Sequence, residues 1–271
     1  MAKRVTTKKG SKSIRSQGFA ALVLGAPALV LITVFMLLPF VMSIGYSFTD
    51  KMLVSGKNNT VNFVGLSNYI KLFTSEAFRQ ACINTVFYTV MVVPSILILA
   101  VLLAVLINRK AKGIALFRMI YFSPQVITMT VVAVVWAFIY SPGENGLLNS
   151  FLGLFGIEPQ LWLKSSSQAM PSIAFMSVWQ ALGMQAVIVL GGLQYISPDL
   201  YEAGKVDGCN SIQEFFYITL PLLRNTITYV IVTNTISSLR LFTQVYVLTN
   251  GGPMGATNSI VFQMYKTGFN N

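Results

Sequence analysis

The sequence predicts an all-α membrane protein, a bundle of five helices that cross the bilayer. Only 10% of its 271 residues are charged and 54% are hydrophobic, whereas a soluble domain carries about 25% charged residues. The apolar residues form stretches long enough for a membrane span, which needs about 20 of them. The net charge of +11 comes mostly from a basic N-terminus and one short loop. This arrangement favours a lipid environment over nucleic acid as the partner.

Each expected span is a long apolar stretch. The first lies within 19–49, where no charged residue occurs. The alternative is a cleaved signal peptide, but its apolar core needs only about 7–15 residues, so we expect this longer stretch to be retained as a span. The other expected spans are Cys82–Ile107, Met119–Tyr140, Ala169–Tyr195 and Leu222–Thr249. Every span contains or borders a proline, which membrane helices tolerate when neighbouring helices satisfy the freed backbone groups. We therefore expect a packed bundle.

Basic loops predict the orientation. The tail 1–18 carries six basic residues, and the loop after span two carries Arg109, Lys110 and Lys112, with Arg118 close by. Lys and Arg are enriched in cytoplasmic loops. The N-terminus and loop 196–221 should therefore be cytoplasmic, and loops 50–81 and 141–168 should face outward.

Several function classes lack their residues. The chain has no histidine, and the spacing of its two cysteines matches neither a zinc site nor a disulfide framework. It has no G-x-x-x-x-G-K-S/T sequence for ATP, and no nucleophile–base set within the spans. An ion-coupled carrier, another alternative, usually has acidic residues in its spans and inverted repeats, and neither is visible.

Loop 196–221 predicts a helix–turn–helix. Leu200, Ala203 and Val206 give one apolar edge, and Gly208 permits a turn with positive φ. We expect Asp207 to cap the second helix. The buried side of that helix should carry Ile212, Phe215 and Phe216. A soluble partner could grip this projection; the alternative is an amphipathic loop that rests on the membrane surface.

The same loop resembles a family signature. Glu202, Ala203, Gly208, Ile218, Leu220 and Pro221 match the E-A-A-x3-G-x9-I-x-L-P pattern of permeases in binding-protein-dependent ABC importers; Gly204 and Cys209 replace alanines of that pattern. Weaker similarities to carbohydrate-uptake permeases occur in order along the chain. They are Ser47-Phe48, 63–69, 117–124, 146–149, Leu193-Gln194 and the L-T-N-G-G-P of 248–253.

The resemblance implies a non-catalytic subunit in a prokaryotic plasma membrane. Its expected partners are a second permease, ATPase subunits that bind ATP and Mg, an extracytoplasmic solute-binding protein and a sugar or oligosaccharide. Alternative solutes are glycerol phosphate, a polyol, an amino acid or a peptide. Family members have six spans, so we expect the gene to continue past Asn271 with another. The implied ATPase-contact residues are Glu202, Ala203, Gly204, Asp207, Gly208, Leu220 and Pro221.

Polar residues on the fifth span predict a solute path. Three-, four- and seven-residue spacings along 222–249 place five polar residues on one helix face: Thr226, Thr233, Ser237, Arg240 and Gln244. Asn234 and Ser238 flank this face, and Trp179 and Gly183 on the preceding span are weaker candidates. The alternative is polar contact between helices, because such side chains also form interhelical hydrogen bonds. For Arg240, an equal alternative is snorkelling to the interface.

Overall fold

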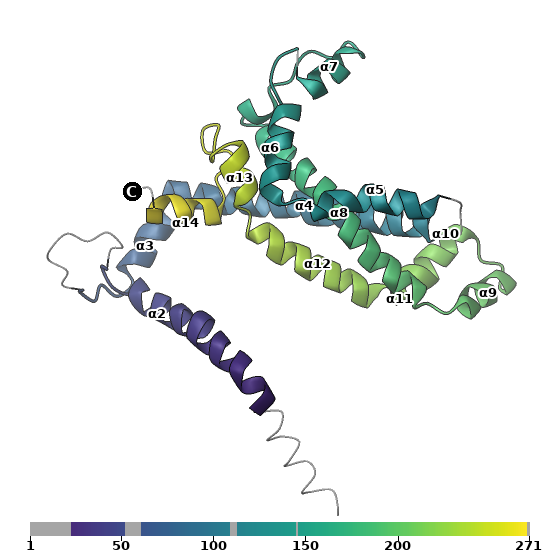
Figure 1. The fold of residues 1–271 in the computed structure, drawn as a ribbon, viewed down its shortest axis with the longest axis horizontal. Coiled ribbons are helices and arrows are strands. Elements are labelled where there is room, and N and C mark those ends of the chain that lie inside the picture. The colour runs from purple at the N-terminus through teal and green to yellow at the C-terminus, as the bar shows by residue number, and fades with distance from the viewer. Residues whose placement is uncertain (1–22, 52–60, 109–112, 145, 270–271) are drawn as a thin grey trace, which may run out of the picture. The chain divides into compact units, whose positions relative to one another are not determined.

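The fold is helical throughout the part of the chain that the structure describes. This computed structural model describes residues 23–51, 61–108, 113–144 and 146–269, where one isolated β-bridge accompanies helices and turns. The basic tail 1–18 and the cluster 109–112, on which the predicted orientation depends, lie outside these ranges. The all-α prediction is therefore confirmed (Figure 1).

Three described helices are long and apolar enough to cross a membrane, namely Val23–Ser47, Glu76–Ile107 and Ala169–Gln194. The number rises to five if each of two bent helix pairs counts as one span. The chain divides into two compact units, 1–73 and 74–271.

The first unit contains the helix Val23–Ser47, whose last part is α2 (Leu38–Ser47), and α3 (Ser67–Thr74). The side-chain amide of Asn68 donates to the Ser47 and Thr49 carbonyls, both at 2.9 Å. The Ser47 and Tyr69 hydroxyls lie 2.7 Å apart. These residues, noted for their family resemblance, therefore join the end of α2 to the start of α3.

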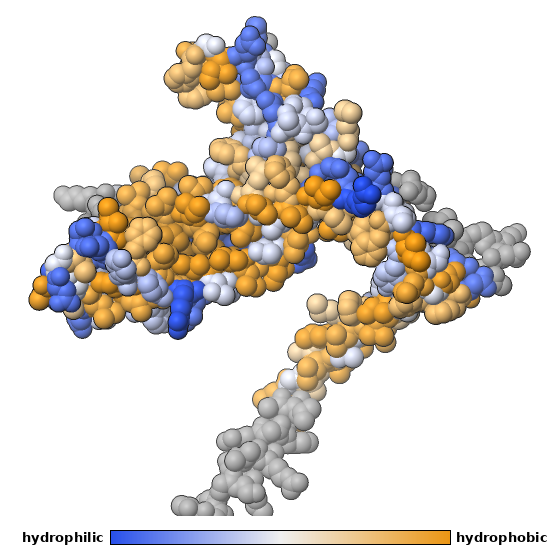
Figure 2. Space-filling model, turned by 180° about the vertical axis from the view of Figure 1, so that it is seen from behind, coloured by the Kyte–Doolittle hydropathy of each residue, from blue (hydrophilic) through white to orange (hydrophobic). Residues whose placement is uncertain are grey.

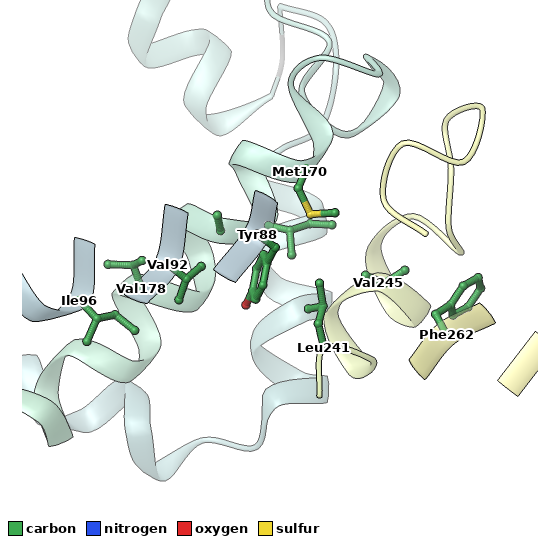
Figure 3. Packing of buried hydrophobic residues seen from close by; sticks show 10 residues of the cluster. Tyr88, Val92, Ile96, Met170, Val178, Leu241, Val245 and Phe262 are labelled. Carbon is green, nitrogen blue, oxygen red and sulfur yellow. The ribbon is translucent and has the colours of Figure 1, made fainter. Parts of the chain in front are cut away.

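Three helices form the core of the second unit: α4 (Glu76–Ile107), α8 (Ala169–Gln194) and α12 (Arg224–Leu239). One buried cluster joins the first halves of α4 and α8 to residues that follow α12, as Tyr88, Met170 and Leu241 illustrate (Figure 3). A second cluster joins the later halves of α4 and α8 to the start of α12. Helices α4 and α8 are therefore parallel, and α12 runs antiparallel to both.

The third expected span is not one straight helix. It is divided into α5 (Ile114–Val126) and α6 (Met129–Ile139), with an angle of 101° between them. Pro124 cannot donate to the carbonyl four residues earlier, and the Ser123 hydroxyl donates to that Ile120 carbonyl at 2.9 Å. Gln180 from α8 donates to the Ile127 carbonyl at the break, at 3.0 Å. Polar side chains thus satisfy the backbone groups that the bend releases.

The fifth expected span, Leu222–Thr249, is also interrupted. Helix α12 follows α11 (Leu220–Leu222) and ends at Leu239, and a new helix, α13 (Thr243–Leu248), begins beyond it. At this second break the Ser259 hydroxyl donates to the carbonyl of buried Leu241, at 2.6 Å. The break contains no proline. It is stabilised by a hydrogen bond from Ser259, a residue of a later segment.

Shorter helices lie between and beyond the spans. They are α7 (Leu147–Gly153), the 3₁₀ turn Trp162–Lys164 and α14 (Ile260–Phe269). Hydrophobic residues cover most of the surface of the second unit's helices, while hydrophilic ones gather near α9 and near α7 (Figure 2). This distribution is typical of a protein whose solvent is lipid.

Candidate coupling loop and solute path

The first half of loop 196–221 is a short capped helix, α9 (Pro198–Val206). The Ser197 hydroxyl caps it by accepting from the Asp199 backbone N–H at 3.4 Å. Asp207 ends the helix, and Gly208 follows with φ of +84°. The predicted glycine turn is confirmed, because this backbone conformation favours a residue without Cβ.

The second half begins with α10 (Ser211–Gln213) and continues as a π-helix (Glu214–Thr219) into α11. Its cap is Asn210, whose side-chain oxygen accepts from the Ile212 and Gln213 backbone N–H groups at 3.1 and 2.9 Å. The predicted cap, Asp207, is wrong. The second helix starts only at Ser211, so Asp207 lies too early in the chain and instead terminates α9.

The two halves pack closely at Gly204. Its backbone is buried, and a Cβ added there would lie 2.8 Å from Ile218 Cδ1. Close by, the Tyr201 hydroxyl and Thr219 Oγ1 lie 3.0 Å apart. Gly204 therefore replaces the family's alanine at a position where the absence of a side chain lets the two halves of the loop pack closely.

The outward surface of the loop is exposed and partly apolar. Leu200 is 45% exposed and Val206 88%. The predicted burial of Ile212 and Phe216 is wrong, since they are 69% and 56% exposed and only Phe215 is half-buried. The π-helix, which starts at Glu214, shifts the angular position of Phe216 away from regular α-helical spacing, whereas Ile212 lies before it in α10. The remaining expected contact residues are exposed, except half-buried Leu220: Glu202, Ala203, Asp207, Gly208 and Pro221.

The polar residues of the fifth span do not all share one helix. Thr226 and Thr233 are half-buried on α12 and Ser237 is exposed, whereas Asn234 and Ser238 are buried against the bundle. Arg240 is the exposed cap that ends α12, and half-buried Gln244 belongs to α13. The prediction of one five-residue face is therefore wrong beyond Ser237, because the helix ends before Arg240.

The two candidates on α8 lie in different settings. Trp179 is 40% exposed, and its ring lies edge-on to that of Trp136 with centroids 5.5 Å apart. Gly183 is buried, and a Cβ there would overlap the backbone of Tyr121 and lie 2.9 Å from Phe122 Cα. Gly183 therefore lies at the close contact between α8 and α5.

Sequence reasoning missed two buried asparagines. Asn84 on α4 donates to the Gly255 and Asn258 carbonyls at 2.8 and 2.9 Å, which ties the loop after α13 to the bundle. Asn149 makes a similar set of bonds between α7 and residues near Trp162. A polar residue inside the apolar stretch 82–107 was the available signal for Asn84, because such groups need partners in a membrane.

Neither the loop nor the path resembles a catalytic centre. Across the described ranges, no group of three or more His, Cys, Asp or Glu side chains gathers as a metal site. A helical bundle with lipid-suited surfaces and a capped loop before its last long helix defines a multi-span membrane protein. Residues 66–271 match the family model described as binding-protein-dependent transport system inner membrane component. The chain belongs to this family.

Individual relatives agree with this assignment. The chain is 37% identical to the probable ABC transporter permease protein YurN of Bacillus subtilis, over 76% of this chain and 72% of the relative. It is 33% identical to the trehalose/maltose transport system permease protein MalF of Thermococcus litoralis, over 89% and 82%. A solved bacterial alginate ABC transporter has the same fold, with a TM-score of 0.80 and 23% identity over 96% of this chain and 86% of that one. The chain is therefore a non-catalytic permease subunit of an ABC importer, as expected.

Proposed function

We propose that this permease forms part of the membrane path for a sugar or oligosaccharide and is driven by ATPase subunits through loop 196–221. Similarity to a relative named for trehalose and maltose transport supports the solute class. The observation that carries the coupling role is the loop itself, where a glycine turn at φ +84° presents exposed Leu200 and Val206 beside exposed Glu202. A docking knob needs such an apolar edge with charge at its rim.

The path role is supported by the exposed side of α12. Tyr229, Thr233 and Ser237 follow one another at four-residue steps and are at least partly exposed. Four-residue steps keep side chains on one helix face. Such polar groups are costly against lipid, so they should face water or protein. A second permease would complete the path, and an extracytoplasmic binding protein would deliver the solute from the side opposite the coupling loop.

The orientation belongs to the same proposal. Helix α4 ends next to the basic cluster 109–112, and the later halves of α4 and α8 pack together, so the loop after α8 lies at the same end of the bundle. The positive-inside rule then makes this end, and the N-terminal tail, cytoplasmic. ATP and Mg would be bound by the partner ATPases.

The test combines a docking variant with a control of equal backbone strain. A Cβ added at Gly208 would meet no other residue within 4 Å beyond its chain neighbours, so Gly208→Asp should disturb a partner and otherwise add only the strain of a positive φ. Gly156→Asp is the control, because Gly156 has φ of +72° and is equally open, but it lies in loop 141–168. We expect Gly208→Asp, and Glu202→Lys, to prevent co-purification of the ATPase and maltose or trehalose uptake into vesicles.

Wild-type assembly and uptake in the double variant Gly208→Asp, Glu202→Lys would contradict the coupling role. Equal loss in Gly156→Asp would mean that backbone strain, not docking, causes the defect. If the importer took up an amino acid or glycerol phosphate but neither sugar, the importer assignment would stand and the proposed solute class would be wrong.

A further inference from the structure

A pocket of about 530 Å³ opens beside the start of α8, apart from the coupling loop and the exposed face of α12. Three aromatic side chains, Tyr140, Trp162 and Phe175, form part of its wall. The rings of Tyr140 and Trp162 lie 5.5 Å apart. The ring of Trp136 lies behind them, 5.1 Å from Tyr140 and 5.7 Å from Phe175. Trp136, which does not itself line the pocket, therefore links the ring of Phe175 to that of Tyr140.

Trp162 is held in an unfavourable backbone conformation. Its φ is +45°, which is a genuine outlier for so bulky a residue. Its backbone N–H donates to Gln168 Oε1 at 3.0 Å, and its indole N–H donates to Asn149 Oδ1 at 2.8 Å. Such conformations persist where the surroundings enforce them, and they cluster at ligand sites. The ring is thus positioned before any ligand arrives.

An ordinary membrane-anchoring role does not fit this tryptophan. An interfacial Trp places its apolar ring in the membrane and its polar N–H toward the wet headgroup region. The Trp162 indole instead bonds to Asn149, which is only 2% exposed. The polar edge of the ring therefore points into the protein, while the ring itself lines the pocket.

Polar groups contribute a small part of the exposed pocket lining, which is mostly apolar. Gln160, Ser167 and Gln168 also line the pocket. The two amide side chains are joined to each other, with Gln168 Nε2 donating to Gln160 Oε1 at 2.6 Å. A side-chain amide has two N–H donors, so this bond occupies only one of the two on Gln168. Packed rings suit the C–H face of a sugar ring, and amides and hydroxyls suit its hydroxyl groups.

We propose that this pocket binds a hexopyranose unit of the transported solute, as an entry site on the extracytoplasmic side. The proposal rests on the sugar-uptake function and on the orientation that places loop 141–168 outside. It adds a site that the solute meets before the face of α12, with Trp162 as its central platform.

The test measures binding of radiolabelled maltose and trehalose to purified permease in nanodiscs without the binding protein. We expect Trp162→Leu to weaken binding about tenfold or more, as loss of an aromatic contact predicts. Phe175→Leu should weaken it severalfold; Phe175 is 62% exposed, so this variant should fold. Phe155→Leu is the control, because Phe155 is 69% exposed and is not among the pocket residues.

Three results would overturn the entry site. The first is that neither sugar binds the wild type. The second is that Phe175→Leu and Trp162→Leu bind the sugars as well as Phe155→Leu does. The third is that lauric acid, but not sugar, occupies the pocket, which would make it a lipid site. Uptake by the assembled importer is measured in parallel. Sugar uptake without pocket binding removes only this inference, whereas absence of any sugar uptake removes the proposed solute class.

Discussion

Gly183 offers a direct test of how α8 meets α5. In Gly183→Ala the new methyl group would overlap the Tyr121 carbonyl oxygen and the Phe122 Cα, which are backbone atoms and cannot rotate away. Overpacking of this kind costs about 1–3 kcal/mol. Alanine also gains about 1 kcal/mol over glycine in a helix. The net change at this position should therefore range from about neutral to a loss of about 2 kcal/mol.

Gly191 on the same helix is the matched control, because no atom lies within 4 Å of a Cβ added there. Gly191→Ala should show the gain in helix propensity alone, so the two variants should differ by about 1–3 kcal/mol. For a protein of this size each kcal/mol shifts the Tm by about 2–4 °C. Thermal unfolding of both variants in one detergent measures the difference.

Equal Tm values for Gly183→Ala and Gly191→Ala would refute the close contact. The solute-path hypothesis for Gly183 makes a different prediction, since it expects altered uptake at an unaltered Tm. Measuring uptake on the same two variants therefore separates a packing role from a path role.

Three further predictions concern the loop and the path. Asn210→Ala should destabilise the loop by about 1 kcal/mol through loss of the cap, whereas Asp207→Ala should not. Hydrogen exchange of the backbone amides of 211–213 measures this difference, and equal protection in the two variants would contradict the assignment of Asn210 as the cap. Arg240→Met should reduce uptake without lowering the amount of protein if Arg240 serves the path, and unchanged uptake would favour snorkelling. A water-soluble thiol reagent should label Thr233→Cys faster than Val232→Cys, since Val232 lies on a neighbouring apolar side of the helix, and the reverse order would place the path on that apolar side.

Much of the fold could be predicted because it depends on properties that are local along the chain. Hydrophobic stretches of sufficient length predict spans wherever they occur, and the helices at 76–107 and 169–194 confirm this. Gly208 was predictable for a similar reason, since a break between two helical patterns needs a residue that tolerates positive φ. The docking and path roles of individual residues remain predictions.

Other features depend on partners that lie far away in the sequence. Asn84 gains its importance only when 255 and 258 come beside α4. The strained Trp162 requires both Asn149 and Gln168 at its side. No periodicity marks such residues, because their hydrogen-bond partners are defined by the packed bundle.

Composition and motif alone determined that this chain is a helical membrane permease. Only the tertiary structure decided where its helices bend. The break after Val126 is satisfied by Gln180 and the break after Leu239 by Ser259. A bend in a membrane helix exposes backbone carbonyls that water cannot reach, so it forms where another segment supplies a donor. Hydrophobicity is carried by each residue, but the donor for a freed carbonyl is supplied by the fold.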